Sequence, residues 1–131
     1  MITQVQIKKI QDYFKNKRKV SYVVLFGSAL KHLKKDSDID LLIDHGSSFE
    51  QRLSYAADLE QLVGRRVDVV PVDGTYYDLA LQAFAYGKII VRRNEQRLKE
   101  DYFRVRRIAD DNLPLERIRR ERLYRVLNGK T

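Results

Sequence analysis

The sequence predicts an α/β (α+β) domain that continues into two basic helices, and three observations support this. Short runs rich in β-branched and aromatic residues are typical of buried strands, and they cover residues 20–26, 38–44 and 66–72. Outside these runs, capping signals and apolar residues at helical spacing predict helices over residues 3–17, 48–64 and 76–86. Beyond residue 94 the apolar residues recur only at helical spacing, which predicts two further helices.

The first helix and the first strand have clear sequence limits. Thr3 and Gln6 form a capping box, and apolar residues follow at helical spacing: Ile7, Ile10 and Phe14. The run Val-Ser-Tyr-Val-Val-Leu-Phe over residues 20–26 then predicts a strand, which Gly27 and Ser28 interrupt. We expect a short helix to start at this Gly-Ser pair.

The middle of the chain predicts a strand, a helix, a strand and a helix. Ser48 and Gln51 form a second capping box, and apolar residues continue to Gly64, a typical helix end: Leu53, Ala57, Leu59, Leu62 and Val63. Pro71 in the third strand suggests a sheet edge or a strand end. Residues 76–86 predict a helix that ends at Gly87, and residues 88–91 predict a short strand or connector.

The two C-terminal helices are predicted from one apolar stripe each. Asn94 is a candidate N-cap, and Asp110, Asp111 and Asn112 end the first of them. Its stripe consists of Leu98, Tyr102, Val105 and Ala109, and we expect Tyr102 to lie in the core. Pro114 is tolerated in the first turn of the second helix, whose apolar face is broader: Leu115, Ile118, Leu123, Val126 and Leu127.

Length and composition fit a single domain. The chain of 131 residues is 44% hydrophobic, which is enough for one core. We therefore expect one domain over residues 1–131, with a core of about residues 1–91 and a helical extension of about 94–127. Cysteine is absent, which excludes a disulfide scaffold, a thiolate zinc site and a cysteine nucleophile, and favours a cytoplasmic protein. No apolar run is long enough to span a membrane.

The net charge of +8 lies mostly near the C-terminus. Residues 1–91 hold 13 basic and 11 acidic residues, whereas residues 92–131 hold 13 and 7. Eleven of the latter 13 basic residues are arginine, which suits bidentate contacts with carboxylate or phosphate groups. Because no base-stacking or groove-reading motif accompanies them, we expect an acidic partner protein rather than direct nucleic-acid binding.

Three carboxylates lie in apolar strands and form the candidate reactive centre. Asp38 and Asp40 are two residues apart, so their side chains point to the same face of a strand. Asp68 joins them if the third strand pairs with the second. Two carboxylates ~5 Å apart repel by roughly 3 kcal/mol at an effective dielectric constant of ~20, so such a cluster keeps a proton or holds a cation. Oxygen ligands without cysteine favour Mg²⁺ or Mn²⁺.

A candidate phosphate site precedes these carboxylates. Gly27 permits close approach of the backbone, and the Ser28 hydroxyl and the N–H groups of a helix start suit a phosphate. A phosphate site ahead of a carboxylate metal site suggests metal-assisted phosphoryl or nucleotidyl transfer.

These residues resemble the signature of the DNA polymerase beta-like nucleotidyltransferase superfamily, and most closely its minimal nucleotidyltransferase (MNT) branch. That branch contains the antitoxins encoded beside HEPN ribonuclease toxins. The resemblance covers residues ~20–91 and lies in three segments: Val23-Val24-Leu25-Phe26-Gly27-Ser28, Asp36-Ser37-Asp38-Ile39-Asp40-Leu41-Leu42 and Arg66-Val67-Asp68-Val69-Val70.

The resemblance implies a fold, an activity and a role for each site residue. The fold would be a small mixed β-sheet flanked by helices. Gly27, Ser28 and Lys31 would bind the triphosphate of ATP, and Asp38, Asp40 and Asp68 would bind two Mg²⁺ ions, with Asp68 also acting as general base. The chain would transfer AMP to a tyrosine hydroxyl of a HEPN toxin with which it forms a hetero-oligomer, and would thereby act as an antitoxin.

Two other functions fit the same residues. A non-catalytic antitoxin would block the toxin by binding, through the arginine-rich helices. A small-molecule nucleotidyltransferase would use the same carboxylates, although such enzymes normally carry a sizeable extra domain that shapes the acceptor pocket.

Overall fold

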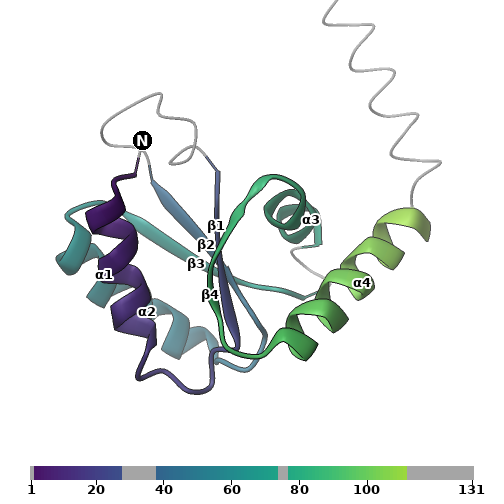
Figure 1. Ribbon diagram of the computed structural model, residues 1–131, viewed down its shortest axis with the longest axis horizontal. Helices are drawn as coiled ribbons and strands as arrows, with labels where there is room; N and C mark the ends of the chain where they lie inside the picture. The colour runs from purple at the N-terminus through teal and green to yellow at the C-terminus, as the bar shows by residue number, and fades with distance from the viewer. Residues whose placement is uncertain (1, 28–37, 74–76, 112–131) are drawn as a thin grey trace, which may run out of the picture.

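The computed structural model describes residues 2–27, 38–73 and 77–111 (Figure 1). Helices and strands alternate along these residues in the order α1 (Gln4–Phe14), β1 (Tyr22–Phe26), β2 (Ile39–Ile43), α2 (Phe49–Val63), β3 (Val67–Pro71), α3 (Tyr77–Tyr86), β4 (Lys88–Arg92) and α4 (Glu95–Asp111). The predicted strands and helices within these ranges are all present. Tyr76, the segment after Gly27 and the second C-terminal helix lie outside the described residues.

The four strands form one mixed sheet in the order β3-β2-β1-β4. β1 pairs antiparallel with both β2 and β4, whereas β2 and β3 run parallel. β3 is therefore an edge strand, as Pro71 predicted. Helices α1 and α2 cover one face of the sheet, and α3 and α4 cover the other (Figure 1).

Coverage of both faces explains why β1 is uniformly apolar. Val23 and Leu25 face the core beneath α1 and α2, whereas Tyr22, Val24 and Phe26 face α3 and α4. Successive strand residues point to opposite faces, so a strand between two helical layers needs apolar side chains at every position.

Both predicted capping boxes are present. Thr3 Oγ1 accepts the Gln6 N–H while Gln6 Oε1 accepts the Thr3 N–H, and Ser48 and Gln51 form the same reciprocal pair. Helix α2 ends at Gly64, whose φ of +70° is the left-handed conformation expected of a glycine cap.

Helix α1 ends at Phe14, three residues before the predicted Lys17, and an arginine distant in the sequence donates to the carbonyl groups around its end. The Arg93 guanidinium donates to the carbonyl oxygens of Phe14, Lys15, Lys17 and Val20 at 2.6–3.1 Å. This contact also joins the β4–α4 connection to the α1–β1 turn.

Helix α4 is integral to the core on its inner face. Asn94 Oδ1 accepts the Arg97 N–H, as predicted for an N-cap, and Leu98, Val105 and Ala109 are buried. Tyr102 is only half-buried and packs edge-on against Phe84. The inner face also carries a carboxylate, Asp101, which is 2% exposed and lies against β1. Among the described residues, no helix is long and apolar enough to cross a membrane.

Candidate active site

The two central carboxylates lie opposite each other on the parallel strands β2 and β3. Asp40 and Asp68 are register partners, and Asp38 immediately precedes β2. Parallel pairing without a register shift puts equivalent side chains on the same face. The structure therefore provides the strand pairing that the sequence required for Asp68 to join Asp38 and Asp40.

The electrostatics of this cluster centre on Asp40. Its carboxyl group is half-buried, and this burial, together with the charges of Asp68 and Asp38, raises its pKa to about 6. Asp68 by contrast is exposed at the sheet edge. Asp40 is thus partly removed from water and also flanked by two like charges. A bound cation would offset both the cost of burying its charge and the repulsion from the neighbouring carboxylates.

Gly27 closes the other side of Asp40. It follows β1 directly, where Phe26 is the register partner of Asp40. Its φ is +84°, and a Cβ at this position would overlap the Asp40 carboxylate. A side chain is therefore excluded on two grounds, the backbone conformation and the close approach to Asp40. The other two predicted triphosphate contacts, Ser28 and Lys31, lie outside the described residues.

A groove of about 560 Å³ follows the exposed edge of β3 and reaches the carboxylates. We call it the β3-edge groove; its lining is Phe26, Asp40, Phe49, Arg52, Leu53, Ala56, Ala57, Glu60, Arg66, Val67, Asp68, Val69, Val70 and Leu79. The sequence predicted α2 partly from the apolar residues Leu53, Ala57 and Leu62, and all three are exposed. The signal in the sequence was the excess of apolar positions, more than one face of a packed helix needs.

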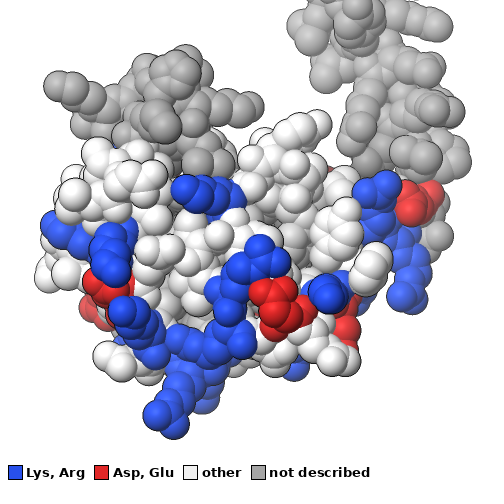
Figure 2. Space-filling view, in the orientation of Figure 1, with Lys and Arg blue, Asp and Glu red and all other residues white. Residues whose placement is uncertain are grey.

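The predicted partner surface on the two C-terminal helices stays a prediction, because the second of these helices lies outside the described residues. Figure 2 shows Lys and Arg gathered where the α1–β1 turn lies close to the end of β4. Two arginines at the end of β4 have partners within the chain, because Arg93 binds backbone carbonyls and Arg92 pairs with Glu95 at 2.7 Å. Part of the C-terminal positive charge therefore serves the fold itself.

The chain matches the family model for polymerase beta nucleotidyltransferases over residues 8–96. This match runs from α1 to the start of α4 and includes Gly27, Asp38, Asp40 and Asp68. The chain belongs to the polymerase beta nucleotidyltransferase family. No curated protein matches it.

Solved structures similar to this family member come from toxin–antitoxin complexes. A chain of the MntA–HepT toxin–antitoxin is 20% identical, with a TM-score of 0.68, and the alignment covers 95% of this chain and 99% of that one. A toxin–antitoxin with AMP-PNP gives 19% identity, a TM-score of 0.68 and coverage of 96% and 99%. A chain from a complex of tri-AMPylated Shewanella oneidensis HEPN toxin with MNT antitoxin is 20% identical, with a TM-score of 0.66. That alignment covers 93% of this chain and 98% of that one. At this level of identity the likeness concerns the fold.

The carboxylates of this family member suit a hard divalent cation. Three side chains supply oxygen donors only, and burial, together with the charges of Asp68 and Asp38, raises the pKa of Asp40. Among the described residues, however, no three acidic, histidine or cysteine side chains lie close enough together to hold a metal ion, so the three carboxylates are not assembled into a metal site in this structure. The fit of Mg²⁺ therefore rests on the chemistry of the donors and on the charge that they leave uncompensated.

Proposed function

We propose that this nucleotidyltransferase is an antitoxin that transfers AMP from ATP to a tyrosine hydroxyl of a HEPN ribonuclease toxin in a Mg²⁺-dependent reaction. The observation that carries the chemistry is the Asp40–Asp68 pair on parallel strands beside Gly27. The fold shared with antitoxins of MNT–HEPN complexes, one with AMP-PNP and one with an AMPylated toxin, supports the nucleotide and the partner.

The reaction is a substitution at the α-phosphorus of ATP. The tyrosine oxygen forms a bond to this phosphorus, the bond to the bridging oxygen of the β-phosphate breaks, and pyrophosphate leaves with the electron pair. The proton of the hydroxyl passes to Asp68, which is exposed and so accessible to an incoming acceptor. Mg²⁺ supplies neutralisation of the phosphate charge.

The proposal gives each residue a role. Asp38, Asp40 and Asp68 would hold Mg²⁺, and Gly27 allows the backbone at the end of β1 to lie against the Asp40 carboxylate. Ser28 and Lys31, which lie outside the described residues, would contact the triphosphate. The toxin contributes the acceptor, so the active complex is a hetero-oligomer.

Mass spectrometry of the toxin tests this function directly. The chain is incubated with ATP, Mg²⁺ and the HEPN-type protein encoded by the adjacent reading frame, and we expect mass increments of adenylyl size on that protein. Asp38→Ala and Asp68→Asn should abolish the increments, whereas Asp110→Asn, which changes an exposed carboxylate on α4, should leave them intact.

The two alternative functions give different results in the same experiment. If the antitoxin is non-catalytic, the Asp38→Ala variant will neutralise the toxin as well as the wild type does. The mass of the toxin will then stay unchanged with either protein. A small-molecule nucleotidyltransferase would release pyrophosphate only with a small hydroxylated acceptor. Either result would contradict the proposal.

A further inference from the structure

Helix α2 has two apolar faces, and only one of them packs against the rest of the chain. Tyr55, Leu59 and Val63 are buried against the core. The other face lies along the β3-edge groove, and its residues alternate between three and one positions apart in the sequence. It consists of the apolar residues Phe49, Leu53, Ala56 and Ala57 and of the charged residues Arg52 and Glu60. Phe49 is 65% exposed and Leu53 is 56% exposed.

Exposed apolar side chains gather at this groove. Seven large hydrophobic residues are exposed in the described part of the chain, and three of them line the groove: Phe49, Leu53 and Leu79. Scattered exposed apolar residues need no explanation, but a concentration beside a reactive centre indicates a binding surface.

The groove lies on the open side of the carboxylates. On one side of Asp40, β1 and Gly27 approach so closely that a single added Cβ would overlap its carboxylate. On the other side stands Asp68, on the last strand of the sheet. Among the described residues, the groove gives an acceptor a route to the carboxylates from the β3 edge.

The backbone of β3 offers little to an added strand. Glu60 Oε1 accepts the N–H of Val67 at 3.1 Å, and Pro71 has no N–H. These two features make the edge a poorer template for another strand. We therefore expect side-chain contacts to supply much of the affinity for an occupant of the groove.

The shape and charge of the groove describe its occupant. Ala56 and Ala57 leave room between the larger side chains for an inserted apolar group. Arg52 donates to the Ser47 carbonyl at 2.6 Å, and its guanidinium lies 5.9 Å from the centre of the Phe49 ring, so this aromatic side chain is held at the rim. Arg66 adds an exposed positive charge at the groove.

We propose that the β3-edge groove docks the segment of the protein substrate that carries the acceptor hydroxyl, a segment with apolar side chains beside the acceptor. This inference rests on the proposed function. It assigns acceptor recognition to Phe49, Leu53, Ala57 and Leu79 rather than to the arginine-rich C-terminal helices. The apolar lining supplies affinity, and its continuity with Asp68 places the hydroxyl beside the general base.

Two groove variants and one matched control test the proposal. Leu53→Glu places a charge in the groove and Ala57→Arg fills it, whereas Leu62→Glu changes an exposed leucine of the same helix that does not line the groove. Each variant is compared with the wild type for thermal unfolding, for binding of ATP with Mg²⁺, for binding of the HEPN-type protein from the adjacent reading frame, and for the rate of AMP transfer to it.

We expect both groove variants to raise the KM for the toxin by about tenfold or more, as loss of a central apolar contact does, while ATP affinity and unfolding temperature stay near the wild-type values. Leu62→Glu should leave all four measurements unchanged. Wild-type KM and wild-type toxin affinity in Leu53→Glu and Ala57→Arg would overturn the proposal.

Two further outcomes identify a different occupant and would also overturn it. Weaker ATP binding in Ala57→Arg would make the groove a nucleotide pocket, and loss of a wild-type homodimer in Leu53→Glu would make it a self-association surface. If the wild type transfers no AMP, the proposed function fails, and the binding measurements still decide whether the toxin occupies the groove.

Discussion

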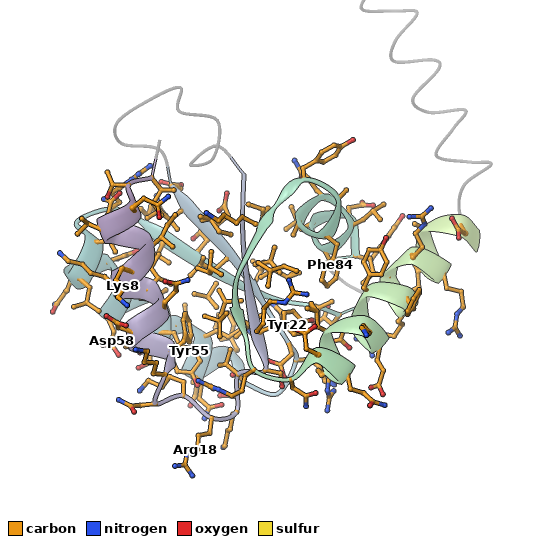
Figure 3. All side chains as sticks on the ribbon, in the orientation of Figure 1. Lys8, Arg18, Tyr22, Tyr55, Asp58 and Phe84 are labelled. Atoms are coloured by element: carbon orange, nitrogen blue, oxygen red, sulfur yellow. The ribbon has the colours of Figure 1, made fainter. Side chains whose placement is uncertain are left out.

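The Tyr22 hydroxyl donates a 2.7 Å hydrogen bond to Oδ2 of Asp101, and this bond joins β1 to α4 inside the core. Figure 3 shows the Tyr22 side chain between the sheet and α4. Arg104 donates to the other carboxylate oxygen at 3.1 Å from a half-exposed position. Burial and the hydrogen bond to Asp101 both raise the pKa of Tyr22, so its hydroxyl remains a donor throughout the neutral range.

Removing the buried hydroxyl group of Tyr22 should destabilise the fold more than removing the half-exposed guanidinium group of Arg104. Tyr22→Phe leaves the Asp101 carboxylate with one donor, and we expect a loss of about 2–3 kcal/mol in the free energy of unfolding. Arg104→Ala should cost less than about 1 kcal/mol, because its side chain is screened by water. Urea unfolding measures both values, and equal effects would show that the buried bond is not the main contribution.

The carboxylate cluster predicts a stabilising substitution in the metal-free protein. Asp40→Asn removes the half-buried charge that Asp38 and Asp68 repel, so we expect a higher unfolding temperature in the presence of EDTA. Asp110→Asn is the control, because that carboxylate is exposed on α4. A lower unfolding temperature for Asp40→Asn would indicate that the carboxylate has stabilising contacts in the fold. With saturating Mg²⁺ the order should reverse, since the wild type then gains the energy of binding.

The stability gained from Asp40→Asn should increase with pH. The pKa of Asp40 is about 6 in the folded chain, above its ordinary value near 4, so the folded state binds this proton more tightly than the unfolded state. The contribution of this group is therefore fully present below about pH 4 and is lost as the pH rises through 6. We expect the advantage of Asp40→Asn to grow over this interval by about 1–2 kcal/mol, allowing for solvent screening. A constant difference in unfolding free energy from pH 4 to 7 would contradict this.

Two glycines with positive φ should respond differently to alanine. Gly27→Ala places a Cβ against the Asp40 carboxylate, whereas Gly64→Ala meets nothing within 4 Å. Both variants carry backbone strain of about 1 kcal/mol. Only Gly27→Ala should also displace Asp40, so we expect it to reduce AMP transfer strongly while Gly64→Ala retains wild-type transfer. Similar activity in the two variants would show that the approach of Gly27 to Asp40 does not matter for catalysis.

The neighbouring residues Arg92 and Arg93 should differ in their contribution to stability. Arg93 donates to four backbone carbonyls around the end of α1, and we expect Arg93→Ala to cost about 2–3 kcal/mol of unfolding free energy. Arg93→Lys should restore little, because an ammonium group cannot donate in the same planar fork. Arg92→Ala removes only an exposed pair with Glu95 and should leave the urea midpoint unchanged. A fully stable Arg93→Ala would contradict this account.

Local sequence predicted most of the fold because its signals are short-range. The capping boxes at Thr3 and Ser48, the glycine end at Gly64 and the uniformly apolar run of β1 each depend on a few neighbouring residues. The contacts at the end of α1 could not be predicted in the same way, because Arg93 makes them from 76 to 79 residues away along the chain.

The sequence by itself determined the candidate reactive groups: three carboxylates in or beside apolar strands and a glycine at the end of the preceding strand. The strand repeat of two residues also predicted that Asp38 and Asp40 share a face, although Asp38 lies just before β2. Only the tertiary structure decided that β3 pairs in parallel with β2, which brings Asp68 opposite Asp40. Strand order depends on long-range packing, which no local pattern encodes. For the same reason, only the folded chain showed that α2 has a second apolar face beside this centre, left exposed along the groove.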